Sequence, residues 1–226
     1  AVNNGTIIKV PFELDPVEGG PIRKQVGRKK LRLPSGEKME EVFAEMRLMP
    51  ANLPDTEPRF INYLVNRSNE SADLAEFMAY SGARISEAAA FKWEDDKANS
   101  VIIRGTKSRS SEDREVPKIP ALRELLQRMR ARRVEDGREI IGKVFGVGQC
   151  RQALASACQK TGIDRLTHHS LRHFFATICI ESGVDIPTIS RWLGHGDGGV
   201  LAMQTYGHLR TEHSFAAAAK VRLSVA

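Results

Sequence analysis

The sequence predicts a mainly α-helical chain with one small antiparallel β-sheet or hairpin, an α+β arrangement. Apolar residues recur at helical spacing in several segments. The strongest is 120–133, which begins with proline and keeps arginines opposite its leucines. Two short β-type runs, 101–103 and 114–117, flank the polar connection GTKSRSSED, which is typical of a hairpin. A hydrophobic fraction of 41% supports a buried core in a chain of 226 residues.

Helix signals follow one another through the first half of the chain. Ser35 precedes an apolar stripe, which predicts a capped helix, and a proline-bounded turn over 50–58 separates it from the next helical region. That region ends at Ser81-Gly82, and a second short helix then carries Arg84 and Glu87. The apolar faces of these helices and of 120–133 comprise Met39, Val42, Phe43, Met46, Leu74, Phe77, Met78, Leu122, Leu125, Leu126 and Met129.

Further helices are expected in the second half. Residues 149–160 form one that stops at Gly162, and Asp185 caps a later one that ends at Gly194. An alanine-rich helix is expected over 215–221. The core residues of the helix that Asp185 caps are Ile186, Ile189, Trp192 and Leu193.

The helix expected over roughly 170–182 separates apolar from basic side chains. On a helical wheel, Leu171, Phe175 and Ile178 fall within about 60° of each other. The basic residues cluster on nearly the opposite side, which predicts that they occupy the open face: His169, Arg172 and His173.

The balance of charge is basic, with a net charge of +6 and a pI of about 9.4. This balance suits a polyanionic partner but does not identify one. The three cysteines form no CxxC pair, which favours a reduced, cytoplasmic chain without a disulfide framework or zinc site. No apolar run is long enough to span a bilayer, and the first residues lack the features of a signal peptide.

A basic segment marks a domain boundary near residue 33. Between residues 20 and 35 no acidic residue occurs, while the basic ones are Arg23, Lys24, Arg28, Lys29, Lys30 and Arg32. The segment is either a solvated linker or an arm that lies along phosphates. We therefore divide the chain into 1–33 and a main domain over 34–226.

Five short motifs follow one another along the chain: SGARISE over 81–87, TKS over 106–108, HSLR over 169–172, LGH over 193–195 and TYGH over 205–208. Each is weak evidence alone. In this order they resemble the catalytic domain of tyrosine recombinases, the phage integrases and their relatives, over residues 34–219. The resemblance implies that family's DNA breaking-rejoining fold. It also implies that 1–33 is the tail of a truncated N-terminal core-binding domain plus a linker.

The resemblance implies an enzyme that cuts and rejoins DNA strands through a 3′-phosphotyrosyl intermediate, without metal, ATP or another cofactor. Planar guanidinium groups suit the charge that develops on phosphodiester oxygens, and Glu87 could hold the first arginine in place. An unperturbed phenol has a pKa near 10, so the nucleophile Tyr206 needs a base, for which His169 is the candidate. Lys107 would protonate the leaving oxygen. The catalytic set is Arg84, Lys107, His169, Arg172, His195 and Tyr206.

The partners that the resemblance implies are double-stranded DNA and further protomers, as a tetramer on DNA. The 215–221 helix would pack into a neighbouring protomer or, equally, on its own domain. Candidate DNA contacts are Arg23, Lys24, Arg28, Lys29, Lys30 and Arg109.

Alternatives remain for each motif and for the whole. Arg84 with Glu87 could be a surface ion pair, Lys107 a solvated loop residue, His195 a helix cap and Tyr206 a core residue. A type IB topoisomerase uses similar residues, and an integrase-derived DNA-binding module could keep the fold without activity. The glycine-rich stretch 196–199 makes the spacing between the last two motifs about two residues longer than the family pattern, which affects the placement of Tyr206.

Overall fold

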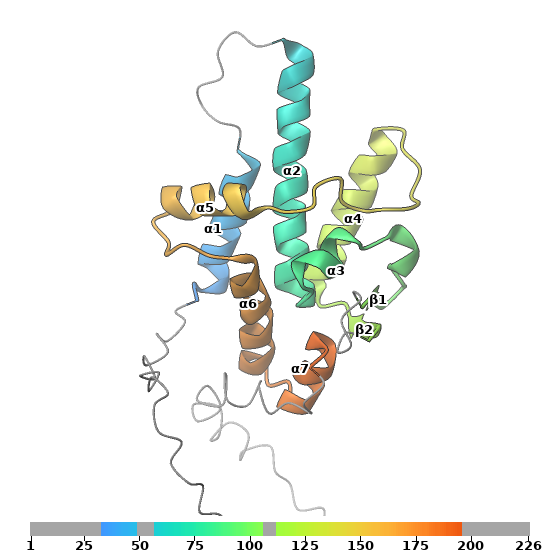
Figure 1. Ribbon diagram of the computed structural model, residues 1–226, viewed down its shortest axis with the longest axis vertical. Coiled ribbons are helices and arrows are strands. Elements are labelled where there is room, and N and C mark those ends of the chain that lie inside the picture. The colour runs from blue at the N-terminus through green and yellow to red at the C-terminus, as the bar shows by residue number, and fades with distance from the viewer. Residues whose placement is uncertain (1–32, 49–56, 106–111, 196–226) are drawn as a thin grey trace, which may run out of the picture. The chain divides into compact units, whose positions relative to one another are not determined.

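The computed structural model describes residues 33–48, 57–105 and 112–195 (Figure 1). Within them it contains helices and one two-stranded antiparallel sheet, which confirms the predicted fold class. In chain order the elements are α1 (Gly36–Arg47), α2 (Pro58–Ser81), α3 (Ile85–Ala89), the 3-10 helix η1 (Trp93–Asp95), β1 (Ser100–Ile103), β2 (Arg114–Pro117), α4 (Pro120–Glu135), α5 (Arg151–Lys160), α6 (His168–Glu181) and α7 (Ile186–Leu193).

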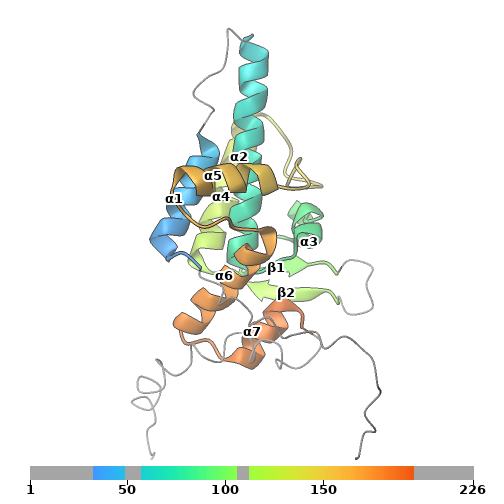
Figure 2. The ribbon, with the colours of Figure 1, turned by 60° about the vertical axis from the view of Figure 1, so that its left-hand side comes forward.

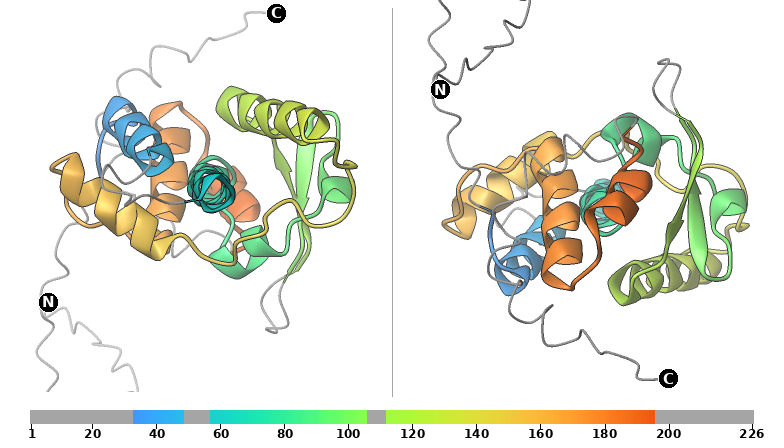
Figure 3. Two further views of the ribbon diagram at one scale, coloured as in Figure 1. Left: turned by 90° about the horizontal axis from the view of Figure 1, so that it is seen from above. Right: turned by 90° about the horizontal axis from the view of Figure 1, so that it is seen from below.

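Helix α2 is the centre around which the other helices pack. It contacts α1, α3, α4, α5 and α6, and the end-on views of Figure 3 show it surrounded by them. The predicted apolar residues Leu74, Phe77 and Met78 are buried on it. Its last turn ends at Gly82, whose φ of 66° is the left-handed conformation that commonly closes helices.

The predicted hairpin is confirmed. β1 and β2 pair antiparallel, with Ser100 opposite Pro117 and Ile103 opposite Arg114 (Figure 2). Beyond the strands, Asp113 accepts hydrogen bonds from the Gly105 N–H and the Arg104 guanidinium, each at 2.9 Å. These contacts close the base of the connection that carries Lys107 and Arg109, both of which lie outside the described residues.

The helix boundaries differ from the predictions by a few residues. α5 begins at Arg151, and α6 begins at His168, because the Thr167 side chain accepts a hydrogen bond from the Ser170 N–H as an N-cap. The predicted cap of α7 is confirmed: Asp185 accepts from the Thr188 N–H at 2.9 Å. Ile186, Ile189 and Leu193 are buried as expected, whereas Trp192 is only partly buried.

Several predictions fall on residues that the structure does not describe. These are the basic segment of 20–33 as far as Arg32, the stretch 196–199, Tyr206 and the helix over 215–221. The division of the chain at residue 33 stays a prediction. None of the described helices combines the length and apolar character that crossing a membrane requires.

Candidate active site

A pocket of about 560 Å³ lies where α2 ends and where α3 and α6 begin, and we name it the α3–α6 pocket. None of the described residues that line it is an aspartate or glutamate. Its lining comprises Met78, Arg84, Ile85, Ser86, Arg151, Arg165, Leu166, Thr167, His168, His169 and Arg172. The structure thus brings together three of the sequence-predicted residues, Arg84, His169 and Arg172, from two distant motifs.

Gly82 positions Arg84 by ending α2 close to two other helices. A Cβ atom at Gly82 would lie 2.6 Å from Phe175 Cδ1 and 2.8 Å from Leu193 Cδ2. With a φ of 66° as well, the position favours glycine on both steric and conformational grounds. The chain then turns immediately, and Arg84 becomes the N-cap residue of α3 with its side chain 38% exposed.

Glu87 holds Arg84 from within the protein. Its side chain is fully buried and accepts from the Arg84 backbone N–H and from Arg84 Nη1, each at 2.8 Å. Burial raises the pKa of Glu87, but the hydrogen bonds and positive charge of Arg114, together with the hydrogen bonds of Arg84, outweigh it and lower the pKa to about 2. Glu87 therefore stays ionised and keeps the Arg84 guanidinium oriented.

Arg114 is a site residue that the sequence reading did not identify. From the start of β2, its Nη2 and Nη1 donate to the two Glu87 oxygens at 2.6 and 3.1 Å, and its Nε donates to the Trp192 carbonyl at 2.7 Å. Its side chain is only 7% exposed. The sequence offered one signal for a role of Arg114: it is the basic residue of a short β-type run, 114–117.

The prediction that Arg172 lies on an open helix face is wrong. Arg172 is 5% exposed and donates from Nη1 to the Gly82 carbonyl at 2.6 Å and from Nη2 to the Leu193 carbonyl at 2.5 Å. Carbonyls at the C-terminal ends of helices lack intrahelical partners, and here the ends of α2 and α7 supply them. The basic trio is therefore divided: Arg172 is buried, His173 partly buried and His169 exposed.

Two histidines of α6, His169 and His173, contact each other and lie near positively charged arginines. The ring centroids of His169 and His173 are 4.3 Å apart, in an edge-to-face arrangement. Burial lowers the pKa of His169, and the charges of Arg172 and Arg84 lower it further. Burial and the same kind of repulsion, from His169, Arg172 and His195, lower the pKa of His173 to about 4. Both imidazoles are therefore neutral at pH 7, and a neutral imidazole can accept a proton.

His195 follows directly after α7. Gly194, with a φ of 66°, ends that helix, and the His195 backbone N–H donates to the Ser190 carbonyl at 3.0 Å. The Gly194 carbonyl lies 3.5 Å from Arg84 Nη2 and accepts a hydrogen bond from it. The LGH motif is thereby joined to Arg84 across 110 positions of sequence.

Arg151 and Arg165 also line the α3–α6 pocket and were not predicted. Arg151 is the first residue of α5, and Arg165 stands four positions before His169 in a loop. Both side chains are exposed. The nearness of Arg165 to the HSLR motif was a signal in the sequence. Arg151 had no such signal, because the packing of α5 brings it to the pocket.

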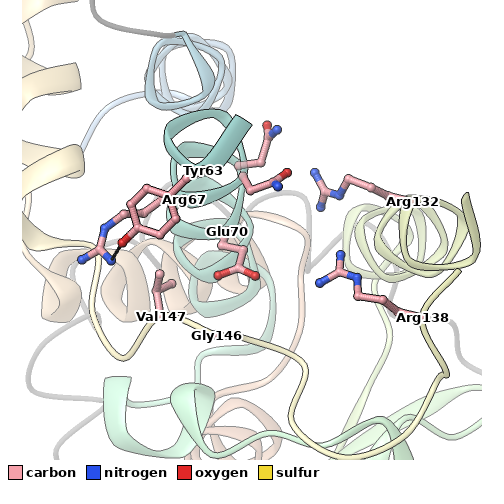
Figure 4. Close-up of a pocket in the computed structure, with 9 residues that line it drawn as sticks. Tyr63, Arg67, Glu70, Arg132, Arg138, Gly146 and Val147 are labelled. Atoms are coloured by element: carbon pink, nitrogen blue, oxygen red, sulfur yellow. Dashed lines mark hydrogen bonds between the residues drawn. The ribbon is translucent and has the colours of Figure 1, made fainter. Parts of the chain in front are cut away.

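A second pocket of about 390 Å³ is lined by α2, the end of α4 and the following loop, and we name it the α2–α4 pocket (Figure 4). Its arginines have partners: Arg132 pairs with Asp73, Arg138 with Asp136 at 2.5 Å, and Arg67 donates to the Tyr63 hydroxyl at 3.0 Å. Figure 4 shows Glu70 among these side chains. No residue of the predicted catalytic set lines it.

Comparison with family models gives a match to the Phage integrase family over residues 54–213. The chain is 32% identical over 150 residues to tyrosine recombinase XerC of Pseudomonas aeruginosa (strain LESB58), which covers 62% of this chain and 48% of the relative. It is 33% identical over 189 residues to tyrosine recombinase XerA of Thermococcus onnurineus (strain NA1), covering 77% of this chain and 64% of the relative. The chain thus spans about half the length of the XerC relative.

Solved structures show the same fold. The catalytic domain of bacteriophage HP1 integrase superposes with a TM-score of 0.60 at 20% identity, covering 86% of this chain and 98% of that one. A post-cleavage complex of the XerH site-specific recombinase, bound to palindromic difH substrate, gives a TM-score of 0.57 at 18% identity. The match covers 88% of this chain and 56% of that one. At these identities the likeness concerns the fold alone.

Proposed function

This chain belongs to the phage integrase family, and from that membership we propose that it is the catalytic part of a site-specific tyrosine recombinase. The observation that carries the proposal is the meeting of separate motifs at one place. Arg172 bonds the Gly82 carbonyl across 90 positions, and Arg84 bonds the Gly194 carbonyl across 110. Packing alone gives no reason for four arginines and two histidines to share one pocket in which none of the described lining residues is a carboxylate.

In the proposed reaction the α3–α6 pocket receives the scissile phosphate. The positive charges of Arg84 and Arg172, which both line the pocket, stabilise the charge that grows on the non-bridging oxygens of the phosphate, with His195 as a further donor. Two fixed arginines thereby supply positive charge of the kind that metal ions supply in other phosphoryl-transfer enzymes. Glu87 keeps the first of them in place.

The covalent step uses Tyr206 and Lys107. The Tyr206 oxygen attacks phosphorus and its proton passes to neutral His169, while the bond from phosphorus to the 5′-oxygen breaks and that oxygen takes a proton from Lys107. The product is a 3′-phosphotyrosyl ester and a free 5′-hydroxyl. Because the ester keeps the bond energy, a second 5′-hydroxyl can reverse the step without ATP, which gives strand exchange.

The proposed partner is double-stranded DNA. Arg151 and Arg165 extend the positive lining of the pocket beyond the predicted residues, and each could neutralise one backbone phosphate. Two structural neighbours are complexes with DNA: XerH with difH substrate and the Tn1549 transposon integrase with transposon right end DNA. The remaining proposed DNA contacts, outside the described residues, are Arg109 and the basic residues of 20–33.

Further parts of the proposal rest on the family resemblance. The protein would act as a tetramer on DNA, with the 215–221 helix joining protomers, and residues 1–33 would connect the catalytic domain to a core-binding domain. The compartment would be the cytoplasm, since the three cysteines are free and buried.

Covalent capture tests the proposed function. The 226-residue chain is mixed with duplexes that carry randomised sequence around a nick, so that a short 5′-hydroxyl fragment is lost after cleavage and religation is blocked. We expect DNA that stays attached to the protein through denaturation and shares a sequence, with none from Tyr206→Phe. Equal recovery from both proteins would contradict the proposal. Capture without sequence preference, together with relaxation of supercoils, would instead support a type IB topoisomerase. Salt-sensitive binding without capture would support an inactive DNA-binding module.

A further inference from the structure

We propose that Arg114, at the start of β2, is a positioning residue that also balances the charge of the candidate active site; this inference rests on the proposed function. Arg114 lies outside the five motifs of the sequence. It reaches Glu87 with both terminal nitrogens and the Trp192 carbonyl with Nε. A side chain that is 7% exposed and donates from all three guanidinium nitrogens is held in one orientation.

The contacts make Glu87 a bridge between two arginines. Glu87 Oε1 accepts from Arg84 Nη1 at 2.8 Å and from Arg114 Nη1 at 3.1 Å. Its Oε2 accepts from the Arg84 backbone N–H at 2.8 Å and from Arg114 Nη2 at 2.6 Å. Each carboxylate oxygen is thus held from both sides, so that Arg114 sets the position from which Glu87 orients Arg84. A lysine has no fork and could not make the paired contact.

Charge gives Arg114 its second role. The three groups Arg84, Arg114 and Glu87 contribute two positive charges and one negative, which leaves one net positive charge. The carboxylate is shared, and the group that faces outward is Arg84, whose side chain is 38% exposed against 7% for Arg114. Without Arg114, Glu87 and Arg84 would form a neutral pair. The pocket would then stabilise less well the charge that develops on the phosphate in the transition state, although Arg84 itself is intact.

The third contact joins the bridge to the LGH motif. Trp192 is on the last turn of α7, two positions before Gly194, and Figure 2 shows α7 beside β2. A Cβ atom at Gly194 would lie 3.1 Å from Arg114 Cδ, so the end of α7 rests directly on this side chain. Arg114 therefore connects the segments that carry Arg84 and His195.

Measuring the rate of covalent capture at saturating nicked duplex tests the proposal through a double-mutant cycle. We expect Arg114→Gln to slow capture by ~100-fold with DNA affinity changed by less than about threefold. Adding Glu87→Gln removes the uncompensated carboxylate and returns the net positive charge. The double variant is therefore expected to be at least ~5-fold faster than Arg114→Gln alone. A purely structural role for Arg114 predicts no recovery in the double variant, since Glu87→Gln weakens a further contact of Arg84 and restores none.

Two further variants keep the test decisive. Arg114→Lys keeps the charge but loses the fork, and we expect its capture rate to fall ~10-fold. This variant still tests the proposal if Arg114→Gln fails to fold. The matched control is Arg130→Gln. Arg130 also pairs with a buried carboxylate, that of Asp96 at 2.6 Å, but it does not line the α3–α6 pocket. Its capture rate per folded molecule should equal that of the parent. A parental rate in Arg114→Lys and Arg114→Gln, or a double variant slower than Arg114→Gln, would overturn the proposal.

A readout without DNA separates this inference from the proposed function. In ¹⁵N spectra of the arginine side chains, Arg84 should show slowed rotation of its guanidinium group in the parent and fast rotation in Arg114→Gln. If the parent captures no DNA, the proposed function fails, and the spectra alone decide whether Arg114 positions Arg84. Unchanged Arg84 signals in Arg114→Gln would refute the positioning role even if the parent is fully active.

Discussion

The α3–α6 pocket and the α2–α4 pocket are both lined by arginine side chains and differ in what faces those arginines. In the α3–α6 pocket no described lining residue is acidic, and Glu87 stands behind Arg84 with its charge shared by Arg114. In the α2–α4 pocket Arg132 and Arg138 are each paired with an aspartate, and Glu70 lines the pocket itself (Figure 4). The first arrangement leaves positive charge available to a ligand, and the second uses it within the protein.

The second arrangement has a structural purpose. The buried carboxylates Asp73 and Glu76 on α2 pair with arginines from two other helices: Arg47 of α1 lies 2.8 Å from Asp73, and Arg128 of α4 lies 2.5 Å from Glu76. These pairs tie α1 and α4 to the central helix. The number of arginines in a region therefore does not locate a phosphate site. What locates it is whether acidic groups compensate them.

The largest expected effect is the loss of Arg172. Arg172→Ala should slow covalent capture by ~1000-fold or more, because it removes a charged donor from the transition state and leaves the Gly82 and Leu193 carbonyls without its bonds. The comparison control is Arg138→Ala in the α2–α4 pocket, which should keep the parental rate. A loss of similar size in both variants would break the distinction between the two pockets.

The next effect concerns stability. Asp73→Asn should lower the free energy of unfolding by about 3 kcal/mol, since it breaks a buried ion network in which the partly buried Arg132 loses its carboxylate and Arg47 keeps only Glu76. Urea denaturation measures the loss, and the capture rate per folded molecule should stay parental. If Asp73→Asn changed the capture rate but not the stability, the α2–α4 region would belong to the active site.

The pH dependence of the capture rate tests whether His169 is the general base. Its pKa lies below its ordinary value of 6.5, so its proton leaves at lower pH and the neutral base is present above that pKa. At limiting duplex, where the rate reports the DNA-free protein, the rate should drop about tenfold per pH unit as the pH falls through this lowered pKa, with the midpoint below 6.5. His169→Gln should remove this limb. A midpoint above 6.5 in the parent would contradict the assignment.

The smallest effects should come from the exposed arginines at the pocket. Arg151→Ser and Arg165→Ser should each reduce the slope of log affinity for duplex DNA against log salt by about 0.9, the value for one phosphate contact. Arg67→Ser in the α2–α4 pocket is the matched change and should leave the slope unaltered. Equal slopes for all three variants would show that the two pockets contribute alike to DNA binding.

The sequence allowed prediction of features that depend on local pattern. The proline at the start of α4, the Asp185 cap and the hairpin are all encoded within a few residues, and the structure has them. The contact of Arg84 with Glu87 was also accessible, because residues three apart face each other across one helical turn.

Features that depend on tertiary packing were missed. Arg114 and Arg151 come from a strand and a helix start, and nothing local marks the first as a partner of Glu87 or the second as part of the pocket lining. The error for Arg172 has a different origin. A helical wheel places Cβ atoms, whereas a guanidinium group sits several bonds farther and can turn toward helix ends that the wheel does not include.

Site-directed cross-linking can show which of the two pockets receives the scissile phosphate. Ser86 lines the α3–α6 pocket and Asn66 lines the α2–α4 pocket, so Ser86→Cys and Asn66→Cys place one exposed thiol at each. The native thiols of Cys150 and Cys179 are buried, and burial raises the pKa of each to about 12, which keeps them unreactive. With a duplex that carries a disulfide-activated tether on the scissile phosphate, we expect cross-linking to Ser86→Cys and background yield for Asn66→Cys. Equal or greater yield at Asn66→Cys would contradict the placement of the phosphate in the α3–α6 pocket.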